Sequence, residues 1–230
     1  MRLSIVVPVL DEAALIESAL RALAPLRAQG VELIVVDGES RDGSAAAAVP
    51  WADRVVTVPR GRARQMNAGA ASASGDVLLF LHADTTLPAR ALDAVALALD
   101  PGRAGRRTAS VWGRFDVRIA GSAPVLRIVA ALMNLRSRLT GIATGDQAIF
   151  VTRAAFDAVG GFPEQPLMED IELAKRLRRL SAPACLRERV VTSARRWENR
   201  GTWSTIVLMW RLRLLYRLGI APERLARSYR

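Results

Sequence analysis

The chain has 230 residues, 51% of them hydrophobic and 24% charged, which is the composition of a folded globular protein long enough to bury a full core. Its formal net charge of +11 predicts a face that attracts anions, such as nucleic acid, an anionic membrane or a phosphorylated substrate, without choosing among them. A single cysteine, Cys185, excludes a disulfide framework and a cysteine zinc site, and it fits a reducing compartment.

The first 100 residues predict strands that alternate with helices. Leu3 to Val9 is a β-branched run that ends before "DE" and lacks a small-residue cleavage site, so it predicts a first strand and not a signal peptide. Further buried-type strands are predicted at residues 31–36, 55–58 and 77–81. Apolar residues at helical spacing follow the strand at Leu3 to Val9 and the strand at residues 55–58. Uninterrupted apolar strands that alternate with helices indicate an α/β fold with a parallel sheet covered on both faces.

Polar residues follow the ends of these four strands: Glu12, Asp37, Arg62, and His82 with Asp84. Because residues just past the carboxyl ends of parallel strands line the ligand crevice of such sheets, we expect these side chains to converge. In "FLHADTTLP" the fourth strand delivers a histidine and an aspartate two positions apart. Asp84 suits Mg²⁺ or Mn²⁺, which take one or two carboxylates, whereas His82 could ligate the ion or donate a hydrogen bond.

The alternation weakens after Pro101. Residues 108–121 predict one longer strand, residues 124–139 form an apolar stretch that contains three arginines, and residues 143–153 predict a strand entered through a turn. A helix is predicted within residues 167–180, where Asp170 lies on the same face as the apolar leucines. Asp170 is a candidate base for removing a proton from an acceptor hydroxyl. Alternatively, Glu169 or Asp170 stabilises the helix dipole by about 0.3–1 kcal/mol without doing chemistry.

The C-terminal stretch "TWSTIVLMWRLRLLYRLGI" is apolar but is interrupted by three arginines. A spanning helix needs about 20 mostly apolar residues, and each central arginine costs at least ~2.5 kcal/mol, which argues against a transmembrane span. Two interpretations stay open. The stretch is an amphipathic helix in a membrane interface, with Trp203, Trp210 and Tyr216 at headgroup depth, or it is a helix packed on the domain.

Six motifs occur together in a fixed order: "SIVVPVLDEA", "VELIVVDGESRDGS", "GRARQMNAGA", "LLFLHADTTLP", "GDQAIFVTRAAFDAVGGFPEQPLMEDIELAKRLRR" and "SARRW". In this order and spacing the chain resembles the family 2 glycosyltransferases, inverting enzymes of the GT-A type. It is most similar to the small bacterial subgroup of radical-SAM/selenodomain-associated transferases. The resemblance covers nearly the whole chain and rests on the collinearity of the motifs, since no single motif is decisive.

The resemblance assigns roles to individual positions. It implies that the donor nucleotide and its diphosphate are surrounded by Pro8, Val9, Leu10, Glu12, Asp37, Arg62, Arg196 and Trp197. Asp84 matches the last residue of the Asp-x-Asp metal motif, and Asp170 matches the proposed base. The acceptor-side positions are Gly145, Asp146, Gln147 and Glu169.

Two positions depart from the family pattern. His82 replaces the first aspartate of Asp-x-Asp, which leaves the identity of the divalent cation open. Ser193 replaces a glutamine that helps processive synthases to hold a growing polymer, so we expect transfer of a single sugar.

The resemblance implies a GT-A catalytic domain over residues 1–200, a Rossmann-like, mostly parallel sheet flanked by helices. Residues 1–100 form its nucleotide-binding half and residues 101–200 its acceptor half, and residues 201–230 form an amphipathic helical extension. We expect a cytoplasmic enzyme, peripheral on the inner membrane, that uses a nucleotide-diphosphate sugar, a divalent cation and a hydroxyl acceptor for which a lipid is one candidate.

Two other functions stay open. A sugar-nucleotidyltransferase would carry a glycine-rich, basic loop after the first strand, where this chain has "PVLDEAAL". A basic module that binds membranes or nucleic acid would explain the net charge, but the arginines are spread along the chain without a dense stripe, so nucleic acid is not an expected partner.

Overall fold

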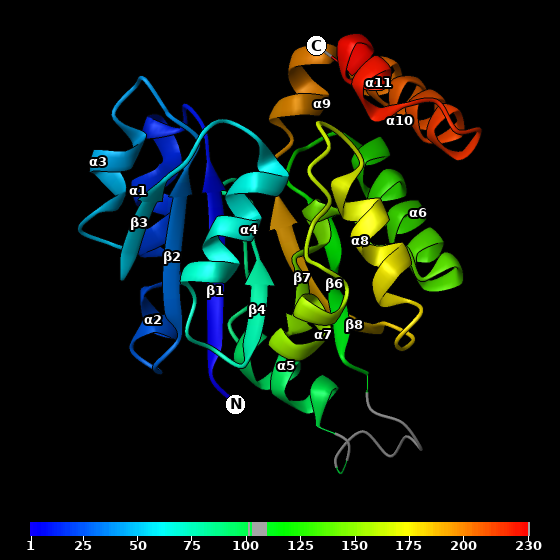
Figure 1. The fold of residues 1–230 in the computed structure, drawn as a ribbon. Coiled ribbons are helices and arrows are strands. Elements are labelled where there is room, and N and C mark those ends of the chain that lie inside the picture. Colours follow the sequence, from blue (N-terminus) through cyan, green and yellow to red (C-terminus); the bar gives the residue numbers. More distant parts are fainter. Residues whose placement is uncertain (101, 103–109, 230) are drawn as a thin grey trace.

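The computed structural model describes residues 1–100, 102 and 110–229, which form a mixed sheet with helices on both faces (Figure 1). The sheet has the strand order β3-β2-β1-β4-β7-β6-β8-β5. Its strands are β1 Leu3–Val9, β2 Glu32–Asp37, β3 Arg54–Thr57, β4 Val77–Phe80, β5 Thr85–Thr86, β6 Trp112–Ile119, β7 Ile149–Thr152 and β8 Ala184–Thr192. The predicted α/β fold is confirmed, and a strand overlaps each predicted run. Residues 108 and 109 of the predicted strand 108–121 lie outside the described residues, and β5 and β8 were not predicted.

The first four strands are parallel, as their uninterrupted apolar runs predict. Val6 pairs with Ile34 of β2 and with Phe80 of β4, and all three side chains are buried. The second half of the sheet departs from this pattern, because β7 runs antiparallel between β4 and β6, and β5 runs antiparallel to β8. The sheet is therefore parallel on the side of β1 and mixed on the other side.

Helices cover the sheet from two sides. They are α1 Ala13–Arg21, α2 Ala24–Arg27, α3 Ser44–Ala48, α4 Arg62–Ser72, α5 Ala91–Leu99, α6 Pro124–Thr140, α7 Arg153–Ala158, α8 Glu169–Leu177, α9 Arg195–Arg200, α10 Thr202–Arg217 and α11 Pro222–Tyr229. Ile5 and Val7 of β1 pack towards α1, α3 and α5, and Val6 packs towards α4, α7 and α8, as expected for a strand whose side chains alternate. A Cβ on Gly69 of α4 would lie 2.3 Å from Val6, so glycine allows α4 to rest directly on the sheet.

A buried ionic network holds α6 against β6. The Arg114 guanidinium is fully buried and donates to the Asp116 carboxylate, which also accepts from Arg138 of α6 at 2.7 Å. Asn134 of α6 accepts from the Val117 N–H at 2.8 Å and donates to the Val117 carbonyl at 3.0 Å. These contacts hold α6 in place, and α6 also forms one wall of the cavity described below.

The C-terminal helix α10 has one packed face and one open face. Its Leu212 is buried beside Met168 and Leu225, and the Tyr216 hydroxyl donates to Glu172 of α8 at 3.2 Å, so Tyr216 packs on the domain and does not face outwards. Trp203 and Trp210 point outwards and are 73% and 69% exposed. The packed face agrees with the second interpretation of this segment, and membrane contact through the outward face stays a prediction. Throughout the described ranges, every helix is too short or too polar to cross a membrane.

Candidate active site

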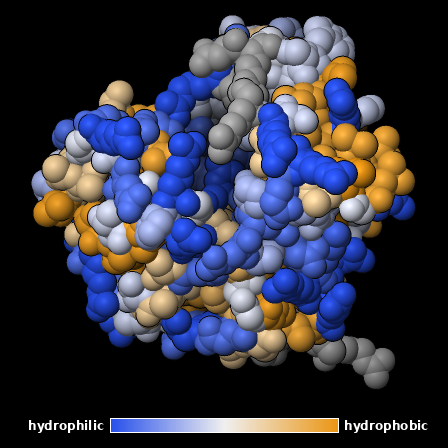
Figure 2. Space-filling view, turned by 45° about the horizontal axis from the view of Figure 1, so that its top comes forward, coloured by the Kyte–Doolittle hydropathy of each residue, from blue (hydrophilic) through white to orange (hydrophobic). Residues whose placement is uncertain are grey.

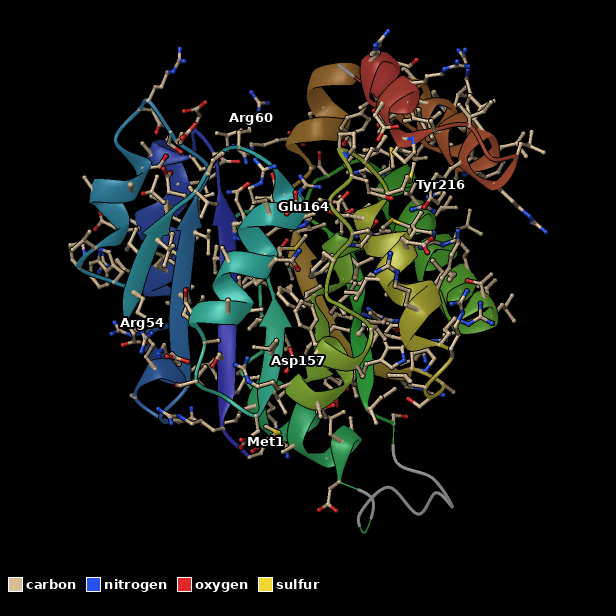
Figure 3. All side chains as sticks on the ribbon, viewed as in Figure 1. Met1, Arg54, Arg60, Asp157, Glu164 and Tyr216 are labelled. Atoms are coloured by element: carbon tan, nitrogen blue, oxygen red, sulfur yellow. The ribbon has the colours of Figure 1, made fainter. Side chains whose placement is uncertain are left out.

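A cavity of about 1230 Å³ opens at the carboxyl ends of the parallel strands. Its walls come from the end of β1, the start of α4, the loop after β4, and helices α6, α8, α9 and α10. On the face viewed in Figure 2, hydrophilic residues surround a central hollow and hydrophobic residues gather at one side. Arg60, which lines the cavity, projects from the loop above the strand ends (Figure 3). The predicted convergence at this edge of the sheet is present, with one exception.

The first wall holds the end of β1. Pro8, Val9, Leu10 and Glu12 line the cavity together with Arg62 of α4. Gln65 of α4 is buried and donates to the carbonyls of Val9 and Val36 at 2.7 and 2.9 Å, which ties the ends of β1 and β2 together. A side-chain amide that satisfies two strand ends in this way shapes the wall without changing its charge.

Asp37 is the exception to the predicted convergence. It is 2% exposed and does not line the cavity. Its Oδ2 accepts from the Ser40 N–H at 3.0 Å, and its Oδ1 has no hydrogen-bond partner among the described residues. Asp37 therefore lies behind the wall in this conformation, with one buried oxygen still able to accept a hydrogen bond.

Arg195 connects two carboxylates of the site that are far apart in the sequence. Its guanidinium donates to Glu12 at 3.0 and 3.1 Å, and its Nη2 lies 3.9 Å from the Asp84 carboxylate. The hydrogen bonds to Glu12 raise the pKa of Arg195. The resemblance to family 2 assigns this place near the diphosphate to the neighbouring Arg196 instead. The two adjacent arginines in "SARRW" are the feature of the sequence that could have indicated Arg195. The side chain of Arg196 lies outside the described residues, whereas Trp197 lines the cavity.

The loop after β4 suits a hard cation with few protein ligands. Asp84 lies in the cavity wall and its carboxylate is partly exposed. The described residues include no cluster of three or more histidine, cysteine, aspartate or glutamate side chains that could hold a metal ion. Mg²⁺ and Mn²⁺ do not need such a cluster, because one carboxylate, water and substrate phosphate oxygens can complete their coordination. Asp84 therefore fits a substrate-bridging cation.

His82 is turned towards the turn that contains Gly145. Its Nδ1 lies 3.4 Å from Asp146, and its Nε2 is buried without a hydrogen-bond partner among the described residues. A Cβ on Gly145 would lie 2.5 Å from this Nε2, so the absence of a side chain at Gly145 leaves the space that the imidazole occupies. This orientation favours a role in positioning the turn over a role as a metal ligand.

The two carboxylates at the start of α8 face different surroundings. Met168 adopts φ +66°, a left-handed conformation that turns the chain sharply into the helix. Glu169 is 4% exposed, lines the main cavity and lies 3.8 Å from Arg62. Burial raises the pKa of Glu169, the charge of Asp170 raises it further, and Arg62 opposes both.

Asp170 is held by backbone donors. Its Oδ2 accepts from the Gly145 N–H at 2.8 Å, and its Oδ1 accepts from the Ile171 N–H at 2.7 Å. Asp170 borders a small pocket with His82 and Gly145, next to the main cavity but outside its lining. These two backbone donors fix the orientation of the Asp170 carboxylate at the start of α8.

The remaining acceptor-side positions divide between cavity and core. Asp146 lines the cavity. Gln147 is fully buried, where its amide oxygen accepts from the Thr144 N–H at 3.3 Å and its amide nitrogen donates to Asn134 at 3.5 Å. Gln147 thus connects the turn to α6 and does not face the cavity.

The far end of the cavity lies between α6 and α10 and is mostly apolar. Its walls include Leu132, Leu135 and Leu139 of α6, and Met209 and Trp210 of α10. The sequence marked both segments as apolar, but nothing local indicated that they face each other across one cavity.

The chain matches one known family in sequence and several solved structures in fold. Residues 4–154 match the family described as "Glycosyl transferase family 2". No curated protein sequence matches the chain. Among solved structures, the chain is similar to the mannosyltransferase PcManGT from Pyrobaculum calidifontis in complex with GDP-Man and Mn²⁺, at 23% identity and a TM-score of 0.65. It covers 94% of this chain and 61% of the mannosyltransferase chain.

Two more similar structures carry related ligands. Glucosyl-3-phosphoglycerate synthase from Mycobacterium tuberculosis, in complex with Mn²⁺, UDP and glucosyl-3-phosphoglycerate, shares 25% identity at a TM-score of 0.61, over 95% of this chain and 80% of that one. S. aureus TarS in complex with UDP-GlcNAc shares 18% identity at a TM-score of 0.66, over 84% of this chain and 58% of that one. The chain thus spans about three fifths of the mannosyltransferase and of the TarS chain.

Proposed function

The chain belongs to glycosyl transferase family 2, and from this premise we propose that it is an inverting enzyme that transfers one sugar from a nucleotide-diphosphate donor to a hydroxyl acceptor. The observation that supports the proposal is the grouping of Asp84, Arg195 and Glu169 around one cavity, with Asp170 beside it. Such a cavity combines charge for a leaving diphosphate with a carboxylate for the acceptor proton. Similar structures hold GDP-Man or UDP together with Mn²⁺.

We propose that residues 1–100 bind the donor, residues 101–200 bind the acceptor, and residues 201–230 form an extension. Pro8, Val9 and Leu10 would contact the nucleoside, because they form the wall at the end of β1. Asp37 would act from behind this wall through its unpaired oxygen.

Asp84 would hold the divalent cation. When bound, Mg²⁺ or Mn²⁺ supplies positive charge that neutralises the leaving diphosphate. Arg195 and Arg62 add fixed positive charge around the same group, and Arg196 is a further candidate from the sequence comparison. His82 would ligate the ion only if its imidazole left Asp146.

The acceptor hydroxyl would attack the anomeric carbon from the face opposite the diphosphate. Its oxygen forms the new bond, while the bond from the anomeric carbon to the diphosphate oxygen breaks and the electron pair leaves with the diphosphate. The hydroxyl proton passes to the carboxylate of Asp170, which two backbone donors hold in place. Glu169 is the second candidate base, since it lines the main cavity directly.

We propose that the acceptor is a lipid and that the enzyme acts at the cytoplasmic surface of the inner membrane. The supporting observation is a row of exposed apolar side chains along one face of each of two helices. On α6 these are Ile128, Leu132, Leu135 and Leu139; on α10 they are Trp203, Val207, Trp210 and Leu214, and Leu218 follows directly after the helix. Apolar faces beside arginines, with tryptophan at the rim, suit the interface of an anionic membrane.

The test is release of nucleoside diphosphate from a panel of UDP-, GDP- and dTDP-sugars with Mg²⁺ or Mn²⁺, with and without bacterial lipid extract. We expect release from one donor, stimulated by lipid and lost in both Asp84→Ala and Asp170→Asn. Asp157→Asn is the matched control, because this exposed carboxylate lies at the end of the molecule opposite Arg60 (Figure 3).

Three results would change the proposal. Full release by Asp170→Asn, with loss in Glu169→Gln, would move the base to Glu169. Release of pyrophosphate from a nucleoside triphosphate and a sugar phosphate would indicate a nucleotidyltransferase instead. Binding to vesicles or DNA without turnover of any donor would favour the basic binding module.

A further inference from the structure

Two arginines in the cavity have no role in the reaction outlined above. Arg136 of α6 and Arg213 of α10 both line the cavity, on opposite helices of its apolar end. Nε and Nη2 of Arg136 and Nε of Arg213 are buried and have no hydrogen-bond partner among the described residues. Both residues are half-buried, and a guanidinium nitrogen that is shielded from water without a partner is costly, so the two need an explanation.

The positive charge of Arg213 lies close enough to act on Arg136. Burial lowers the pKa of Arg136 to about 10, and the nearby charge of Arg213 contributes to the shift. Burial also lowers the pKa of Arg213. The other buried arginine near α6, Arg114, is compensated by a direct contact with Asp116. Neither Arg136 nor Arg213 has such an ion pair with a described carboxylate, so their positive charge is available to a ligand.

The surroundings favour a phosphate group as that ligand. The planar guanidinium presents parallel N–H donors that match phosphate oxygens, and two guanidiniums can share one dianion. The neighbouring lining residues Leu135, Leu139 and Trp210 are apolar and supply no competing acceptor.

The position of the pair favours the acceptor over the donor. The proposed diphosphate end of the cavity is marked by Asp84, Arg195 and Glu12 at the strand ends. Arg136 and Arg213 come from α6 and α10 instead, and the carboxylates that act on both are Asp170 and Asp146, on the acceptor side. We propose that Arg136 and Arg213 bind a phosphate group of the acceptor, so that the acceptor is a phosphorylated hydroxyl compound. This inference rests on the proposed function and narrows its acceptor class.

The experiment varies the phosphate and the lipid part separately. The probes are glycerol 3-phosphate, glycerol, vesicles of phosphatidylglycerol, and phosphatidylcholine vesicles that contain diacylglycerol. Calorimetry and vesicle flotation measure binding to the wild type, Arg136→Gln and Arg213→Gln, and UDP with Mn²⁺ is titrated in parallel as a readout of the donor end. Arg127→Gln and Arg217→Gln are matched controls, because these arginines of α6 and α10 are exposed.

We expect glycerol 3-phosphate and the vesicles of phosphatidylglycerol to bind, and glycerol and the vesicles of net-neutral phosphatidylcholine with diacylglycerol to fail. Each of the two cavity variants should weaken phosphate binding by about tenfold to a hundredfold, the loss of one hydrogen bond to a charged group. The control variants and the affinity for UDP should not change. Unliganded Arg136→Gln and Arg213→Gln should unfold at the wild-type temperature or above it, since each removes a half-buried charge that has no ion pair with a described carboxylate. Binding of glycerol 3-phosphate would identify a soluble acceptor class, and binding of phosphatidylglycerol alone a lipid phosphate.

Three outcomes would overturn the inference. Unchanged phosphate binding in both variants would remove the arginines from the site. A parallel loss of UDP affinity would assign the pair to the donor diphosphate. Equal binding of diacylglycerol and phosphatidylglycerol would show that the lipid, and not the phosphate, is recognised. The proposed function fails separately, when no nucleotide sugar is turned over while the phosphate probes still bind through both arginines.

Discussion

The turn at Gly145 connects His82 to Asp170, and Gly145→Ala tests this connection. The added Cβ would lie 2.5 Å from His82 Nε2 and 2.6 Å from Cε1, whereas ordinary contact begins at 3.4 Å. The imidazole or the turn must therefore move by about 0.9 Å. Because the Gly145 N–H also donates to Asp170 at 2.8 Å, a moving turn displaces the proposed base.

Both stability and activity should respond. Overpacking of this kind costs about 1–3 kcal/mol, and for a chain of this length 1 kcal/mol corresponds to about 2–4 °C in Tm. We expect Gly145→Ala to lower the Tm by about 2–12 °C in thermal unfolding followed by circular dichroism. A displacement of about 1 Å in a catalytic group can cost about a hundredfold in rate, so release of nucleoside diphosphate should fall by a similar factor.

A double-mutant cycle separates the proposed clash from a general loss of fold. In the background His82→Ala the imidazole is gone, and Gly145→Ala should then cost less by about 0.5–3 kcal/mol than in the wild type. Gly102→Ala is the control, since the nearest atom among the described residues, Asp100 Oδ1, lies at 3.4 Å and the backbone of Gly102 needs no left-handed conformation. An unchanged Tm for Gly145→Ala, or an equal cost in both backgrounds, would refute the reasoning.

Three more predictions follow from the buried charges and the open helix faces. Asp116→Asn leaves the fully buried Arg114 uncompensated and should cost about 3–5 kcal/mol in urea unfolding; a loss below about 1 kcal/mol would contradict the network. Glu169→Gln should gain stability over the wild type as the pH rises from 4.5 to 8. Burial first of all raises the pKa of Glu169, so its ionisation is costly in the folded state. The wild type therefore loses stability as the pH rises through the raised pKa. A difference in Tm that does not vary with pH would argue against it. Replacing Trp203 and Leu214 together by serine should weaken binding to anionic vesicles about tenfold or more, without changing turnover of a soluble donor, because neither residue lines the cavity; equal flotation of variant and wild type would count against membrane docking.

The local sequence determined the elements and the residues at their ends. The runs that became β1, β2 and β4 are mostly apolar, which is the pattern of strands buried on both faces, so their positions follow from composition and period. The run at β3 was also predicted to be buried, but β3 is a partly exposed edge strand. Strand ends in a parallel sheet share one edge, and this rule brought Glu12, Arg62 and Asp84 to the same cavity. The six motifs could also be recognised from the sequence, because each is contiguous in the chain.

Only the tertiary structure decided which distant residues meet and which way they face. Arg195 reaches Glu12 across 183 positions, and its neighbour Arg196 carries the same charge, so no local rule could choose between them. Asp37 fell behind the cavity wall, because the backbone donor of Ser40 holds one of its oxygens there. In the sequence, Arg136 and Arg213 only interrupt two apolar segments. In the structure they are neighbours, because the packing of α6 and α10 places both segments around one cavity. Sequence patterns report the period and the ends of an element, whereas the approach of two side chains depends on how whole elements pack.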